Sequence, residues 1–184
     1  MKITGVIIAG GQSRRMGFDK KQIDFEGKSF LQRSIDLLTK ITDEVVINSN
    51  ENIPTSLHII KDESQNKGPL GGIYSVLKNI KNDLALVVPG DLPLLDEEVL
   101  EFLLNNYDGK SKACVFEVNN HIEALVGLYH KNILPDMEQQ LASGEYKLQI
   151  LLEKVVAQKV SGNQFAGKFL NINTPQDLDF LKNV

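Results

Sequence analysis

Short apolar runs of strand length recur along this chain and alternate with segments whose apolar residues follow the helical period. The strand-like runs cover residues 3–9, 45–48, 57–60, 84–89, 113–118, 124–129, 155–160 and 169–172. The helical patterns, with apolar positions three or four residues apart, cover residues 30–41, 70–80, 96–106 and 132–141. Repeated alternation of strand and helix predicts an α/β fold with a mostly parallel central sheet.

The same pattern predicts where the sheet has its centre and its ligand-binding edge. The run "LALVVP" is apolar at every position, which is typical of a parallel strand covered by helices on both faces. The stretch "VFEVNNHIEALVGLY" predicts two antiparallel strands joined at Asn119 and Asn120. Because no Pro-, Gly- or Ser-rich linker divides the chain, residues 1–184 are expected to form a single domain. Ligands of open α/β sheets lie beyond the carboxyl ends of the strands, so the polar residues after the first four strand-like runs are the candidates for chemistry.

Composition narrows the class of protein. The 184 residues carry a net charge of −4, which argues against a general nucleic-acid or acidic-membrane binder. The single cysteine, Cys114, lies in the strand-like "KACVFEV" and is expected to be a small buried side chain in a reduced protein. The N-terminal apolar run is too short for a signal peptide, and no stretch approaches the roughly 18 apolar residues of a membrane span. We therefore expect a soluble, cytoplasmic protein without a membrane or nucleic-acid partner.

The first strand-like run leads into a basic segment that contains glycine, "AGGQSRRMGFDKK". Gly10 and Gly11 allow the backbone to turn sharply and to approach a ligand closely. Free backbone N–H groups in such a turn attract phosphate, and Arg15 and Lys20 would add full positive charges. The segment matches neither the P-loop pattern nor the dinucleotide pattern GxGxxG. A local phosphate site is favoured here over a purely structural turn.

A carboxylate follows the most apolar strand. In "VVPGDLPLL", Asp91 comes directly after that strand and is held between Gly90 and a Leu-Pro step. Such a carboxylate suits Mg²⁺, which prefers oxygen ligands and bridges substrate phosphates; the alternative is an aspartate that only shapes a turn. The acidic residues 96–98 begin a predicted helix, where negative charge offsets the helix dipole, and they are assigned structural roles.

Two further segments carry polar candidates. In "KDESQNKGPLGGI", Asp62 follows a strand and glycines stand at positions 68, 71 and 72, where they either let a flat base or ribose lie against the backbone or merely shape a turn. In "FLNINTPQDL", Asn171 and Asn173 occupy alternate positions and share one face, from which they could hydrogen-bond a polar ligand. The histidines lie without an evident Ser or Cys partner, so neither a catalytic triad nor a zinc site is predicted.

Four motifs together resemble the molybdenum cofactor guanylyltransferase family of MobA-like nucleotidyltransferases. They are "IAGGQSRRMGFDK", "GPLGGI", "GDLP" and "NINTPQDL", which follow the family's order across residues 8–178. The resemblance implies a Rossmann-like three-layer α/β/α fold that joins GMP from GTP to the terminal phosphate of molybdopterin and releases pyrophosphate. GTP and molybdopterin would be substrates and Mg²⁺ the cofactor, and proteins that supply molybdopterin or mature molybdoenzymes would be transient partners.

The resemblance also implies residue roles. Arg15, Lys20 and Asp91 would be catalytic, with Asp91 also the ligand of Mg²⁺, and no covalent enzyme intermediate would form. The residues implied in binding the substrates are Ile8, Ala9, Gly10, Gly11, Lys20, Asn48, Asp62, Gly71, Gly72, Asp91, Asn171 and Asn173.

The acceptor and the base leave alternatives open. Ala124 stands in "IEALVGLY" where the family commonly has proline, in the part expected to meet the pterin, while "GEYKL" at residues 144–148 resembles the acceptor-side segment. The Gly10-Gly11 pair favours guanine as the base. The rival functions are a cytidylyl- or sugar-1-phosphate nucleotidyltransferase of the same fold and a non-catalytic GTP-binding regulator.

Overall fold

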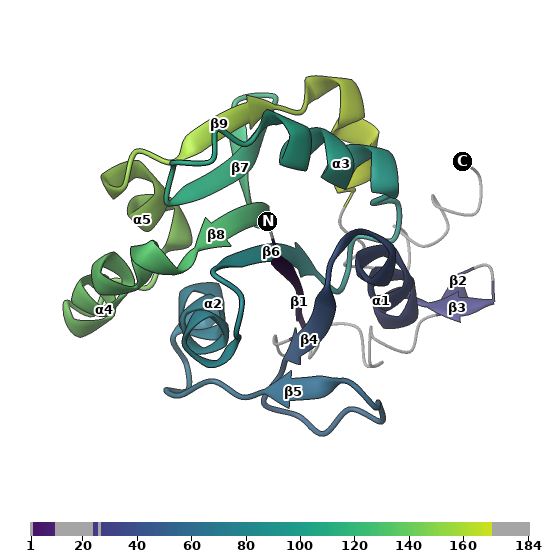
Figure 1. Cartoon of the computed structure of the whole chain (residues 1–184), viewed down its shortest axis with the longest axis horizontal. Helices are drawn as coiled ribbons and strands as arrows, with labels where there is room; N and C mark the ends of the chain where they lie inside the picture. The colour runs from purple at the N-terminus through teal and green to yellow at the C-terminus, as the bar shows by residue number, and fades with distance from the viewer. Residues whose placement is uncertain (1, 10–23, 26, 171–184) are drawn as a thin grey trace.

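The computed structural model describes residues 2–9, 24–25 and 27–170, and within them seven strands form one sheet (Figure 1). The strand order is β5-β4-β1-β6-β8-β7-β9. Neighbouring strands are parallel except where β8 pairs with β6 and with β7, so the predicted mostly parallel sheet is confirmed. The strands are β1 (Ile3–Ile8), β4 (Glu44–Asn48), β5 (His58–Ile60), β6 (Leu84–Pro89), β7 (Ala113–Val118), β8 (His121–His130) and β9 (Gln158–Ser161).

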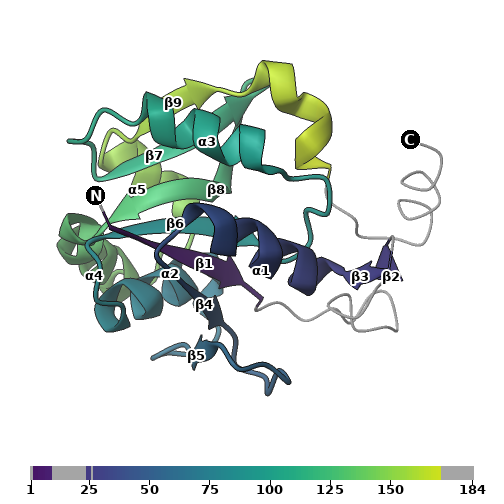
Figure 2. The same ribbon diagram turned by 45° about the vertical axis from the view of Figure 1, so that its right-hand side comes forward.

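Helices cover both faces of this sheet and give the molecule three layers (Figure 1). One face carries α1 (Phe30–Ile41), α3 (Glu97–Asn106) and the 3-10 helix η3 (Asn163–Phe169). The other face carries α2 (Gly68–Asn79), α4 (Leu134–Ala142), which follows the 3-10 turn η2 (Lys131–Ile133), and α5 (Leu148–Lys154). A short hairpin of β2 (Asp24–Phe25) and β3 (Lys28–Ser29) projects at one end, next to α1 (Figure 2). No helix in the described segments is long and apolar enough to cross a membrane.

The central strands explain why the hydrophobic pattern predicted the fold so directly. Every residue of β1 and of β6 is buried, because helices lie against both faces and leave no solvent-facing positions. The hairpin predicted at Asn119 and Asn120 joins β7 to β8, and both residues have positive φ angles, 48° and 64°. Asparagine tolerates this left-handed conformation, which two-residue hairpin turns require.

The helix start predicted at the acidic residues 96–98 is confirmed. Asp96 is the N-cap of α3, and its carboxylate accepts a hydrogen bond from the Val99 N–H at 3.2 Å. Glu97 and Glu98 follow in the first turn, where their charges oppose the helix dipole.

Two predicted strands near the C-terminal end of the described chain are wrong in part. The run at residues 155–160 becomes a strand only from Gln158, because the N–H groups of residues 155–157 donate back to carbonyls of α5 and Val156 takes a positive φ of 51°. The run at residues 169–172 begins in η3, and its residues beyond position 170 lie outside the described part. Phe165 and Phe169 stand four residues apart in η3 and place their rings edge-on to Phe116, at 6.4 and 5.2 Å between centroids. This aromatic contact favours a helical turn over a strand.

Cys114 is fully buried in β7, as the sequence predicts. Burial raises the pKa of its thiol to about 12, so the thiolate that a nucleophile would need is scarce at neutral pH.

Candidate active site

The carboxyl ends of four parallel strands meet at one edge of the sheet and are tied together by backbone hydrogen bonds. The Ala9 N–H donates to the Asn48 carbonyl at 2.9 Å, which joins the end of β1 to the end of β4. The Gly90 N–H donates to the Ile8 carbonyl at 3.2 Å, and the Ser49 N–H donates to the Ile60 carbonyl at 3.1 Å. The predicted site residues that follow these strands are therefore carried on one continuous edge, as expected for an open α/β sheet.

Asn48 and Asp62, which the sequence predicts to bind the nucleoside, form one hydrogen-bonded group with Asn50. The Asn48 side-chain amide is buried and donates both to the Ile60 carbonyl, at 3.1 Å, and to Asp62 Oδ1, at 2.9 Å. Asn50 Nδ2 donates to Asp62 Oδ2 at 2.9 Å, while the Asp62 N–H donates back to Asn50 Oδ1 at 2.9 Å. Both carboxylate oxygens of Asp62 are thus held in place. Asn50 was missed by sequence reasoning, although its position two residues after Asn48 was a usable signal.

Gly71 and Gly72 each leave room for a neighbouring side chain. A Cβ atom at Gly72 would overlap Asn48 Oδ1 and would lie 3.1 Å from Asn48 Cγ and 3.5 Å from Asp62 Oδ1. A Cβ atom at Gly71 would lie 2.6 Å from Lys67 Cβ. Both glycines are buried in the first turns of α2. Their direct contact with guanine stays a prediction, but the structure gives them a supporting role that the sequence did not reveal.

A pocket of about 540 Å³ lies over this group of residues. Such a volume is within the usual range of small-molecule sites, and its polar lining offers both hydrogen-bond donors and acceptors. The pocket is lined by Ile8, Asn48, Ser49, Asn50, Glu51, Asp62, Gln65, Asn66, Gly68 and Pro69. We call it the nucleotide pocket.

Asp91 follows the end of β6, the strand next to β1 in the sheet. Asp91 is half-exposed and lies in a turn that is anchored by the buried Leu92 and by the hydrogen bond from the Gly90 N–H to the Ile8 carbonyl. Among the described residues no three His, Cys, Asp or Glu side chains gather as a metal cluster. A single carboxylate at this edge of the sheet nevertheless fits Mg²⁺, which commonly takes one or two protein carboxylates and completes its shell with water and substrate phosphates.

The remaining predicted site residues lie outside the described part of the chain. They are Gly10, Gly11, Arg15, Lys20, Asn171 and Asn173.

A second pocket, of about 580 Å³, lies beside the first half of β8 and includes Ala124, the position expected to meet the acceptor. Pro69 lines both pockets, so they adjoin at the start of α2. The lining residues are Pro69, Pro89, Leu92, Ile122, Glu123, Ala124, Leu125, Val126, Tyr146, Lys147, Leu148, Gln149 and Phe169. We call it the acceptor pocket.

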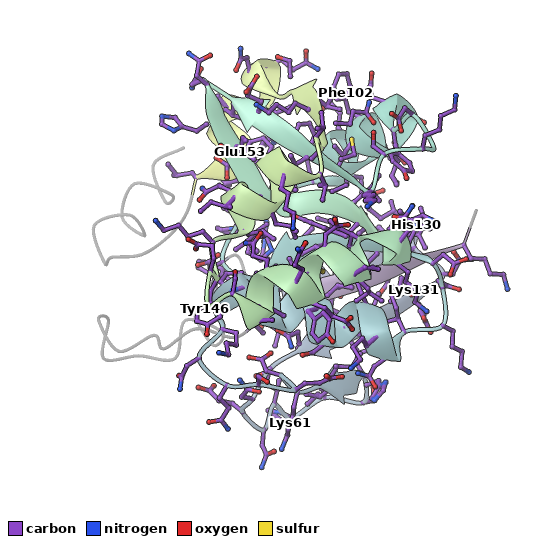
Figure 3. The ribbon with its side chains drawn as sticks, turned by 90° about the vertical axis from the view of Figure 1, so that its left-hand side faces the viewer. Lys61, Phe102, His130, Lys131, Tyr146 and Glu153 are labelled. Atoms are coloured by element: carbon purple, nitrogen blue, oxygen red, sulfur yellow. The ribbon has the colours of Figure 1, made fainter. Side chains whose placement is uncertain are left out.

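The loop between α4 and α5, which carries Tyr146 (Figure 3), is fastened to the start of α2. The Lys67 ammonium donates a hydrogen bond to the Tyr146 hydroxyl and lies 4.1 Å from the centre of its ring. On the other side, Gln140 Nε2 donates to the Lys147 carbonyl at 2.9 Å. The family resemblance places residues 144–148 near the acceptor. The contact between Lys67 and Tyr146, which are 79 positions apart, could be seen only in the folded structure.

The fold and its polar edge define an open α/β protein, a class whose ligands, nucleotides among them, bind beyond the carboxyl ends of the parallel strands. Comparison with known proteins narrows this class. The MobA-like NTP transferase domain family matches residues 5–160. A molybdenum cofactor guanylyltransferase from Aliivibrio fischeri is 31% identical over 179 residues, covering 95% of this chain and 92% of that protein. The chain belongs to the MobA-like NTP transferase family, and the resemblance predicted from its motifs is confirmed.

Solved structures support the same fold. Molybdopterin-guanine dinucleotide biosynthesis protein A from Archaeoglobus fulgidus superposes with a TM-score of 0.83 at 21% identity, covering 98% of this chain and 97% of that one. The 2-C-methyl-D-erythritol 4-phosphate cytidylyltransferase from Thermus thermophilus superposes with a TM-score of 0.74 at 18% identity, with all of both chains covered. The predicted Rossmann-like nucleotidyltransferase fold is confirmed, and it is shared by transferases of different nucleotides.

Proposed function

We propose that this protein transfers GMP from GTP to the terminal phosphate of molybdopterin, forming molybdopterin guanine dinucleotide and pyrophosphate. The observation that carries the proposal is the pair of adjoining pockets at the carboxyl edge of the sheet, which meet at Pro69. One pocket is lined mostly by polar residues around Asp62, and the other combines apolar residues with the polar side chains of Glu123, Lys147 and Gln149. Two substrates that must be brought together need two neighbouring sites. The name of the Aliivibrio fischeri relative supplies the choice of substrates.

The chemistry requires positioning and charge neutralisation more than a protein nucleophile. An oxygen of the acceptor phosphate attacks the α-phosphorus of GTP, a new P–O bond forms, and the bond to the bridging oxygen breaks so that its electron pair leaves with pyrophosphate. Cys114 is fully buried and its thiol pKa is raised, which agrees with direct transfer. Arg15 and Lys20 would stabilise the charge that develops on the leaving pyrophosphate.

In this proposal Asp91 would hold Mg²⁺, which when bound would screen the repulsion between the phosphates. The Asn48, Asn50 and Asp62 group would orient the nucleoside, since the amides hold both carboxylate oxygens of Asp62 in fixed directions. Rigid placement of one reactant lowers the entropic cost of bringing the second into line. A cytoplasmic location and a single functional domain are part of the same proposal.

The deciding experiment is an incubation of the purified chain with GTP, Mg²⁺ and molybdopterin, followed by mass detection of the dinucleotide. Asp91→Asn should lower turnover by roughly 10²-fold or more. Asp83→Asn is the matched control, because Asp83 is an exposed aspartate that precedes the opposite end of β6, and it should leave turnover unchanged. A parallel incubation with CTP tests the base. Equal turnover by Asp91→Asn and the wild type, or product with CTP alone, would contradict the proposal.

A further inference from the structure

The acceptor pocket owes its shape to an irregular stretch in the middle of the sheet. On paired strands β7 and β8, Val115 faces Gly127, but the next residue, Phe116, faces Glu123. Residues 124–126 of β8 fall between these two pairs, so β8 has a bulge there. The bulge turns consecutive residues of β8, from position 122 to position 126, toward one cavity.

Two contacts hold this bulge in one conformation. The fully buried Tyr129 donates a hydrogen bond from its hydroxyl to the Ala124 carbonyl at 2.5 Å. Gly127 provides the close approach of the two strands, since a Cβ atom there would lie 2.7 Å from Val115 Cγ1 and 3.0 Å from the Cys114 carbonyl oxygen. The segment that carries Glu123 is therefore a fixed wall of the pocket, which is what a specific binding site needs.

Glu123 is the one carboxylate among the residues that line the acceptor pocket, where apolar side chains stand beside the polar Tyr146, Lys147 and Gln149. Burial raises the pKa of the Glu123 carboxyl, opposed by the nearby His121. No hydrogen bond from a residue of the described segments reaches this carboxyl group. A carboxylate that is partly removed from water without donors is unfavourable in the empty protein, and a ligand that brings two N–H donors to it would recover that cost on binding.

We infer that Glu123 recognises the acceptor through a flat amino-substituted heterocycle, by accepting two parallel hydrogen bonds from a ring N–H and the adjacent amino group. This assignment rests on the proposed function, in which the acceptor carries a pterin. The 2-amino-4-oxo ring of a pterin presents such a pair of donors on one edge. An ionised carboxylate offers two acceptor oxygens and no donor, so the match is bidentate.

The surroundings of Glu123 agree with this orientation of the acceptor. Leu92 and Leu125 supply apolar surface to the pocket, on which the faces of a flat ring can lie. Pro89 and Leu92 also line the pocket, and they flank Asp91 in sequence at a distance of one or two residues. A heterocycle at Glu123 would therefore extend its phosphate along this wall toward Asp91, and past Pro69 to the nucleotide pocket.

Direct binding of two small fluorescent probes tests the inference without any catalytic turnover. The probes are pterin and lumazine, in which a carbonyl group replaces the amino group of pterin. The wild type should bind pterin at least about tenfold more tightly than lumazine, because the charge-assisted hydrogen bond from the amino group would be lost and the lumazine carbonyl would face the carboxylate.

Glu123→Gln keeps the shape of the side chain but replaces one acceptor oxygen by an NH₂ donor. This variant should bind pterin about 10- to 100-fold more weakly than the wild type, and its preference should shift toward lumazine, whose neighbouring N–H and C=O complement an amide. Glu101→Gln, on an exposed position of α3, is the control and should retain the wild-type preference. Equal binding of the two probes by the wild type, or an unchanged preference in Glu123→Gln, would overturn the inference.

Kinetics separate this inference from the proposed function and from a rival in which Glu123 reads guanine, whose edge carries the same two donors. With GTP, Mg²⁺ and molybdopterin, Glu123→Gln should raise the KM for molybdopterin by about tenfold or more and leave the KM for GTP unchanged. A rise in the KM for GTP alone would overturn the inference in favour of guanine. If the wild type forms no dinucleotide, the proposed function fails, while the comparison of pterin with lumazine still decides the role of Glu123.

Discussion

Replacing Gly72 by alanine tests whether the α2 glycines support the nucleotide pocket. The new methyl group would overlap the side-chain oxygen of Asn48 and would lie 3.1 Å from its Cγ. Asn48 is only 2% exposed and is held by hydrogen bonds to the Ile60 carbonyl and to Asp62. The amide cannot move away from the methyl group without breaking these bonds.

The size of the effect follows from the bonds at stake. Loss of the bond to the carbonyl costs about 0.5–1.5 kcal/mol, and loss of the bond to the Asp62 carboxylate costs about 1.5–3 kcal/mol. Alanine is better than glycine inside a helix by about 1 kcal/mol, which offsets part of this loss. Gly72→Ala should therefore lower the free energy of unfolding by about 1–3.5 kcal/mol, and it should raise the KM for GTP because Asp62 loses one of its two amide partners.

Urea unfolding followed by circular dichroism measures the change, since the chain has no tryptophan. The decisive comparison is a double-mutant cycle with Asn48→Ala, which removes the side chain that the methyl group would meet. In that background Gly72→Ala should become neutral or stabilising by up to about 1 kcal/mol. Gly167→Ala is the control, because a Cβ atom there meets nothing within 4 Å. If Gly72→Ala costs the same free energy with and without Asn48, the reasoning is refuted.

Three further predictions concern the acceptor side and the buried thiol. Lys67→Met should raise the KM for molybdopterin several-fold and leave the KM for GTP unchanged, because Tyr146 would lose both the cation over its ring and the donor to its hydroxyl. Tyr146→Phe keeps the ring and should have a smaller effect in the same assay. An equal change in both KM values would contradict this role of Lys67. Cys114 should resist a thiol reagent at pH 8 in the folded protein and react fully in urea, because burial raises its pKa to about 12; rapid labelling without urea would disprove the expected protection. Burial raises the pKa of the Glu123 carboxyl above its ordinary value of 4.5, so ionisation of Glu123 should destabilise the folded protein above the folded-state pKa and have no effect on stability below 4.5. Glu123→Gln should therefore have a higher Tm than the wild type at pH 7 and the same Tm near pH 4. An increase in Tm that is the same at both pH values would count against this cause.

Much of the fold was predictable because its central strands are buried on both faces. The apolar runs of β1 and β6 have no solvent-facing positions, so their sequences carry the signal of a parallel sheet without any knowledge of their partners. The turn at Asn119 and Asn120 was equally local, since its positive φ angles require residues of that type. The strand predicted at residues 169–172 was wrong in its described part because Phe169 packs on Phe116, which lies more than fifty positions earlier.

In the candidate site too, features that depend on one segment could be predicted from the sequence, whereas features that depend on the pairing of two strands could not. Asp62 and Asp91 could be predicted as site residues from their place just beyond a strand, because parallel strands bring their carboxyl ends to one edge. Asn48, the last residue of β4, was implied by the family resemblance. The partnership of Asn50 with Asp62 depends on the pairing of β4 with β5. The exposure of Glu123 to the acceptor pocket depends on a bulge between β7 and β8. Neither the register of β4 and β5 nor the bulge in β8 can be predicted from the hydrophobic pattern of a single segment.

The two adjacent glycines of α2, Gly71 and Gly72, lie against residues that support the two different pockets. Successive residues of a helix point about 100° apart, so Gly71 and Gly72 face different neighbours from a single turn. Gly72 accommodates Asn48 beneath the nucleotide pocket, whereas Gly71 accommodates Lys67, which holds Tyr146 at the acceptor pocket. A shift of this turn would move both supports together. In the proposed function, the first turn of α2, including Pro69 where the pockets adjoin, would therefore set the separation of the two substrates, on which alignment of the attacking phosphate depends.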